Sequence, residues 1–257
     1  MNVPIYSKNN TCLFLVLDDD NNSGDYNGKY GKGKIKFDYS DECIRCVSYW
    51  RERGGELANI PIIVYIPNSM RNDEINDTLE QYGCEIYHYM LDKQKYPCGY
   101  WNIPYCGCLF ERQDNNFEYI IHIDLDMILV KPIPFDILSM NDESICKIAI
   151  NKHRPTRQTT IVIQPIYKFE INTGFISSIK SKKFYTKWWK LLKEKSETLI
   201  RDDNYSIWEE RICDVMYVDL GYKFDFFDEY QLGYKEDCKI ENILFLHFHP
   251  TLEKSST

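Results

Sequence analysis

The chain has 257 residues, a hydrophobic share of 44% and a formal net charge of −8 at pH 7. That length buries a sizeable core without disulfide bonds, and the apolar content excludes an intrinsically disordered chain. The acidic balance makes nucleic acid a poor candidate partner, but it leaves room for a phosphorylated ligand held through a metal ion.

The first part of the chain alternates between short apolar runs and amphipathic segments. The runs at 12–17, 60–66, 85–89, 119–123 and 145–150 predict strands, and the segments at 40–53, 72–82 and 104–112 predict helices. Asn72 is suited to capping the second helix, and Gly83 follows its end. The alternation predicts an α/β fold with a mostly parallel central sheet and helices on both faces. Ligands bind such sheets beyond the carboxyl ends of the strands.

The second part of the chain is less regular. After a segment at 160–166 comes Asn172-Thr173-Gly174, for which we expect a tight turn between apolar runs. Helices are predicted at 182–194 and 208–217, and a closing strand at 243–246 leads into His247. Because no linker-like stretch separates the halves, we expect one domain over 1–257. Its nucleotide-binding half would span about 1–130 and its acceptor-side half about 131–257.

Ten cysteines raise the alternatives of a zinc site, redox chemistry or simple packing. Cys43 and Cys46 form the only CxxC, and on the helix predicted at 40–53 they share a face with Val47 and Trp50. This placement favours core packing. Residues 1–10 lack a secretory pattern, and no apolar stretch approaches the roughly 20 residues that cross a bilayer. We therefore expect free thiols, no transmembrane segment and a cytoplasmic location.

Asp124 and Asp126 are the strongest chemical signal in the sequence, because they follow the buried strand predicted at 119–123 directly. Carboxylates two residues apart at a strand end can turn toward one point at the mouth of the sheet. Buried carboxylates need a cation or good hydrogen bonds, and oxygen ligands favour Mn²⁺ or Mg²⁺, which also bind diphosphate. The simpler alternative is that these carboxylates cap the turn after the strand.

The order of the motifs resembles glycosyltransferases of the GT-A fold, most closely the glycogenin-like and galactosyltransferase-like retaining families. Four parts carry the resemblance: a first strand ending in acidic residues, the Asp124/Asp126 pair, the Asn-Thr-Gly motif, and a late strand ending in His247-Phe248. The resemblance implies a Rossmann-like sheet, a nucleotide-sugar donor, in our expectation a UDP-sugar, and an acceptor hydroxyl on a glycan or glycoprotein.

The resemblance also implies roles for single residues. Asp124 and Asp126 bind the metal, Asp124 also contacts the donor ribose, and His247 completes the metal site. Asp18, Asp19 and Asp20 hold the base and ribose of the donor, whereas Asn172 and Gly174 face the donor sugar and the acceptor. His249 is an alternative ligand, because residues i and i+2 of a strand share a face. The families usually continue with a Gly and a Lys-Pro-Trp segment, which this chain lacks, so Lys254 is left as a candidate phosphate contact.

An acidic pair in the helix predicted at 208–217 has two interpretations. Glu209 or Glu210 supplies the catalytic carboxylate or the polar group near the anomeric carbon, or both belong to a solvated helix face. Three rival functions also stay open. These are a haloacid dehalogenase-type phosphohydrolase with Asp124 as nucleophile, a nucleotidyltransferase of related topology, and a catalytically inactive nucleotide-sugar-binding module.

Overall fold

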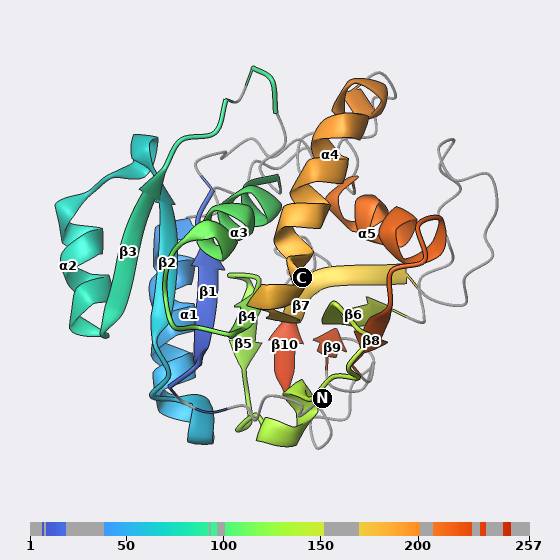
Figure 1. The fold of residues 1–257 in the computed structure, drawn as a ribbon. Helices are drawn as coiled ribbons and strands as arrows, with labels where there is room; N and C mark the ends of the chain where they lie inside the picture. Colours follow the sequence, from blue (N-terminus) through green and yellow to red (C-terminus); the bar gives the residue numbers. More distant parts are fainter. Residues whose placement is uncertain are drawn as a thin grey trace, which may run out of the picture.

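A seven-stranded sheet forms the centre of the molecule (Figure 1). The computed structural model describes residues 7, 9–18, 39–92, 94–96, 101–151, 170–200, 208–227, 232–234 and 244–247. The strands run in the order β3-β2-β1-β4-β7-β6-β8. Their bounds are β1 Thr11–Val16, β2 Ile62–Pro67, β3 Cys84–Tyr89, β4 Tyr119–Ile123, β6 Cys146–Asn151, β7 Glu170–Ile179 and β8 Phe224–Phe226.

The sheet is mostly parallel, as the alternation of elements predicted. Strands β3, β2, β1 and β4 pair in parallel, and so do β6 and β8. Only β7 runs the other way, antiparallel to both β4 and β6. A smaller sheet joins three short strands in the order β5-β10-β9, with bounds Met127–Leu129, Phe245–His247 and Leu232–Tyr234.

Helices cover both faces of the large sheet. α1 (Tyr39–Arg53) and α2 (Asp73–Gln81) pack on the face that carries Leu13 and Leu15. α3 (Asn102–Arg112), α4 (Phe184–Ile200) and α5 (Trp208–Val218) pack on the face that carries Cys12 and Phe14, and Figure 1 shows these three grouped together. The alternation of β1 side chains between the two layers follows from the two-residue period of a strand.

The local signals for the first two helices are confirmed. The side chain of Asn72 accepts a hydrogen bond from Glu74 N at 2.9 Å, and Gly83 takes a left-handed φ of 72° just past α2. Cys43 and Cys46 are buried free thiols that pack with the rest of the α1 core face. No helix among the described residues combines the length and the apolar character needed to span a membrane.

The tight turn expected at Asn172-Thr173-Gly174 is wrong. These residues lie inside β7, and the strand continues on both sides of them. Between Ile148 and Ala149 of β6 the register passes from Ile176 to Asn172, so residues 173–175 bulge out of the pairing with β6. The motif therefore re-aims side chains within a strand, where a connecting loop was expected. The segment expected at 160–166 lies outside the described residues.

Candidate active site

The candidate site lies at the carboxyl edge of the parallel strands. Leu17 and Asp18 follow β1, and Asp124 follows β4. Parallel pairing places Phe14 opposite His122, so the two strands end at the same edge and both aspartates lie just beyond it. This is the edge at which α/β sheets bind ligands.

A tight turn presents the Asp124/Asp126 pair. Met127 N donates to Asp124 O at 3.1 Å and closes the turn between β4 and β5. Leu125 and Met127 point into the core, with exposures of 7% and 1%, whereas Asp124 and Asp126 are both half-buried. The turn thus alternates apolar residues buried in the core with half-buried carboxylates.

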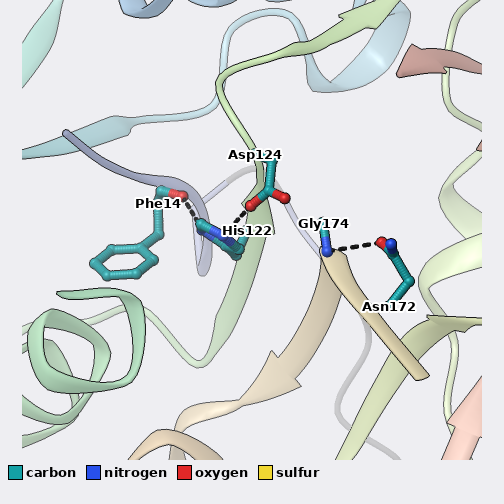
Figure 2. Close-up of polar contacts among 5 residues, drawn as sticks. All are labelled: Phe14, His122, Asp124, Asn172 and Gly174. Atoms are coloured by element: carbon teal, nitrogen blue, oxygen red, sulfur yellow. Dashed lines mark hydrogen bonds and ion pairs between the residues drawn. The ribbon is translucent and has the colours of Figure 1, made fainter. Parts of the chain in front are cut away.

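His122 supports Asp124 from below, a role that the sequence reasoning missed. It is 1% exposed in β4, and its Nδ1 donates to Phe14 O at 3.1 Å. Its Nε2 lies 3.4 Å from Asp124 Oδ1, and Figure 2 shows the ring between the β1 carbonyl and the carboxylate. A signal was available: His122 is the one polar residue in an apolar strand, and it shares a strand face with Asp124.

The bulge in β7 presses against the same carboxylate. Asp124 N donates to Gly174 O at 2.9 Å, and Gly174 N donates to Asn172 Oδ1 at 2.9 Å (Figure 2). A Cβ atom added to Gly174 would lie 3.0 Å from Asp124 Oδ2 and 3.2 Å from Met127 Sδ. Gly174 is thus required for space. Gly174 does not adopt a positive φ, so it is not needed here for a left-handed backbone conformation.

Strand β10 brings the late histidine to this edge. Antiparallel pairing sets His247 opposite Met127, the residue after Asp126, and parallel pairing sets it beside Tyr234 of β9. Phe245 anchors β10 in the core, with its ring 4.7 Å from that of Phe175, the neighbour of Gly174. The backbone of His247 therefore reaches the site as expected. Its imidazole, His249 and Lys254 lie outside the part of the chain whose side chains are described.

At the end of β1 the structure joins Asp18 to a residue that was not predicted. Asn102, the first residue of α3, donates from Nδ2 to Asp18 Oδ1 at 3.0 Å. Asp19 and Asp20 lie outside the described residues, as do the side chains of Glu209 and Glu210 at the beginning of α5. The backbone of α5 packs against β7, the strand that carries the bulge.

Electrostatics separate the carboxylates from the nearby thiol of α1. Burial raises the pKa of Cys46 to about 12; the charge of Arg45 opposes this, and the charges of Asp126 and Asp124 add to it. Because the thiolate is the form that binds metal, Cys46 does not compete with the carboxylates at neutral pH. Among the described side chains no group of three His, Cys, Asp or Glu residues gathers as a metal-ligand set.

Comparisons with known proteins support the fold. No protein-family model matches the sequence, and a search of curated proteins gives no match. Among solved structures, the apo form of mouse xyloside xylosyltransferase 1 superposes with a TM-score of 0.55 at 10% sequence identity. The match covers 93% of this chain and 97% of the mouse chain. The α/β fold expected from the sequence, of the type that GT-A glycosyltransferases share, is thereby confirmed.

Proposed function

We propose that the protein is a glycosyltransferase that moves a sugar from a nucleoside diphosphate sugar, a UDP-sugar, to an acceptor hydroxyl on a glycan or glycoprotein. One observation carries the proposal: three segments far apart in the sequence meet around the turn that carries Asp124 and Asp126. Asp124 bonds to the β7 bulge through Gly174, and β10 aligns His247 beside the turn that holds Asp126. A fold of this type with acidic residues at that edge fits binding of a nucleotide through its phosphates.

The residues present fit a divalent cation. Two half-buried carboxylates at a strand end offer hard oxygen ligands, which Mn²⁺ and Mg²⁺ prefer. Asp124 is 26% exposed at its side chain, so one face is open to a ligand while His122 and Gly174 fix the other. A cation bound there supplies positive charge that stabilises the departing diphosphate.

We assign the remaining roles in the proposed reaction to side chains around this edge of the sheet. Asp124 and Asp126 bind the cation in this proposal, and His247 adds a nitrogen ligand from β10. Asn172 borders the bulge and accepts a hydrogen bond from Gly174 N through its amide oxygen, and in this proposal its side chain faces the donor sugar. Glu209 or Glu210, at the start of a helix packed on β7, is our candidate for the polar group beside the anomeric carbon.

The first test is calorimetry of UDP with and without Mn²⁺, on the parent and on Asp126→Asn. We expect UDP affinity to depend on the metal and to fall in Asp126→Asn by about 10- to 100-fold, because a cation ligand is lost. Asp77→Asn, which removes an exposed carboxylate from α2, is the matched control and should bind as the parent does. Equal UDP affinity after chelation would remove the metal from the proposal.

The second test screens nucleotide-sugars for slow donor hydrolysis in the presence of Mn²⁺. UDP-xylose belongs in the screen with UDP-hexoses, because the superposing mouse protein is a xylosyltransferase. Turnover of one donor supports the transferase and identifies the sugar. Trapping of an aspartyl-phosphate on Asp124 would instead favour the phosphohydrolase, and metal-dependent donor binding without any turnover would favour an inactive binding module.

A further inference from the structure

Asn102 is a buried side-chain amide in which only the nitrogen has a hydrogen-bond partner among the described residues. The residue is 1% exposed, and its Nδ2 donates to Asp18 Oδ1 at 3.0 Å. Its Oδ1 is buried and has no hydrogen-bond partner within the part of the chain that the structure describes. A buried acceptor without a partner costs folding free energy, so an amide kept in this state calls for a ligand that completes it.

Asp18 fixes which end of the amide is offered. A carboxylate only accepts hydrogen bonds, so the amide atom facing it must be the nitrogen. The oxygen is therefore held on the other side, and rotation of the amide by half a turn would set two oxygens against each other. Asp18 itself is half-buried, so the buried amide lies directly beneath a partly exposed carboxylate at the carboxyl edge of β1.

The pair lies where the proposed function needs the nucleoside. Asn102 opens α3, and α3 follows β3, so its first turn lies at the same sheet edge as Asp18 and Asp124. An acceptor whose orientation is fixed discriminates between pyrimidines. Uracil presents an N3–H donor to it, whereas cytosine presents an unprotonated N3 that would face the oxygen lone pairs.

We infer that Asn102 reads the base of the donor, with Oδ1 accepting a hydrogen bond from uracil N3–H while Asp18 locks the orientation of the amide. This inference rests on the proposed function, and it assigns to Asn102 the preference for uridine over cytidine nucleotides. A buried acceptor left facing an acceptor costs enough to make UDP bind about 10- to 100-fold more tightly than CDP.

Calorimetry with Mn²⁺ and four probes tests the inference: UDP, CDP, N3-methyl-UDP and 2′-deoxy-UDP. In the parent we expect N3-methyl-UDP to bind as weakly as CDP, since the methyl group removes the donor. Asn102→Leu should lower UDP affinity and bring the UDP/CDP ratio close to 1. Asp18→Asn, at a half-buried position, frees the amide to rotate and should also reduce the ratio.

Gln113→Leu is the matched control. Gln113 follows the other end of α3, and its amide donates to Tyr65 Oη at 2.9 Å, so its loss should leave the UDP/CDP ratio unchanged.

A folded Asn102→Leu variant with the parent's ratio overturns the inference, and so does a parent that binds N3-methyl-UDP as tightly as UDP. Loss of discrimination against 2′-deoxy-UDP alone would move Asn102 to the ribose and overturn the base contact. Absence of any UDP binding by the parent overturns the proposed function together with the inference. UDP binding without the expected UDP/CDP ratio overturns the inference alone.

Discussion

Gly174→Ala tests whether the β7 bulge holds Asp124 in position. Gly174 takes no positive φ, so alanine brings no backbone strain and the change acts through one methyl group. That methyl would lie 2.9 Å from Asn172 Oδ1, 3.0 Å from Asp124 Oδ2 and 3.2 Å from Met127 Sδ. Ordinary contacts of carbon with these atoms begin near 3.4 Å. Each atom must therefore give by a few tenths of an ångström.

The size of the loss in stability and in metal affinity depends on which of these atoms move to make room for the methyl group. All three belong to the far ends of side chains, so the backbone can stay in place while the carboxylate turns away. Overpacking of this kind costs about 1–3 kcal/mol in the free energy of unfolding. Displacing a metal-binding carboxylate is comparable to losing a group that orients it, which lowers metal affinity by about 10- to 100-fold.

The assay measures thermal unfolding and Mn²⁺-dependent UDP affinity on the same preparation. Gly221→Ala is the control: its Cβ meets nothing within 4 Å, its φ of 68° disfavours alanine, and it lies before β8 at the opposite edge of the sheet. We expect Gly221→Ala to lose about 1 kcal/mol of stability without a change in affinity. Gly174→Ala with the parent's UDP affinity would refute the idea that the bulge positions Asp124.

Three further predictions concern packing elsewhere in the fold and beside the site. Burial raises the pKa of Glu111, whose carboxylate accepts from Tyr185 N and Thr186 N at the start of α4. Folding thus favours the protonated form, so this contribution is complete below the ordinary value of 4.5 and is lost as the pH rises through the folded pKa. The unfolding free energy of the parent minus that of Glu111→Gln should therefore fall as the pH rises above 4.5 in urea titrations, and a flat difference would contradict it. The guanidinium of Arg51 donates to four backbone carbonyls in two loops, which a lysine cannot span. Arg51→Lys should therefore lower stability by about 1–3 kcal/mol in urea, with UDP affinity unchanged. Asn172→Ala leaves the buried Gly174 N without its acceptor and should lower the melting temperature. A variant that melts at the parent's temperature but no longer transfers sugar would show that Asn172 acts only as a sugar contact.

The parts of the fold predicted from the sequence are those encoded by local pattern. Continuous apolar runs predicted strands β1 and β2, and a cap with a following glycine predicted the bounds of α2. Helix starts were less accurate. α3 begins at Asn102, two residues before the expected start, because Pro104 is tolerated in a first turn. α4 begins only after Lys183, which takes a left-handed φ of 57°.

The rest depends on contacts between distant residues. Asn172-Thr173-Gly174 has the composition of a turn, but its flanking residues are held in a strand, because 175–179 pair with β4 and 170–172 pair with β6. Strands β5, β8 and β9 have three residues each, too few to show a period. The contacts of Asn102 with Asp18 and of His122 with Phe14 join residues 84 and 108 positions apart, and no local pattern encodes them.

The antiparallel placement of β7 governs when the site can exist during synthesis. The first part of the chain leaves the ribosome in the order β1, α1, β2, α2, β3. Its three strands pair with one another, so this layer can pack early. β4 pairs with β1 on one side, but its partner on the other side is β7, which is synthesised much later. β7 also carries Gly174, whose carbonyl accepts the hydrogen bond from Asp124 N. β10 arrives last and pairs with β5 across more than a hundred residues of chain. A ribosome-bound chain stopped before 244 would thus hold the layer of β1, β2 and β3 without β10 and His247. Under the proposed function, Mn²⁺-dependent UDP binding should appear only after β10 has left the ribosome.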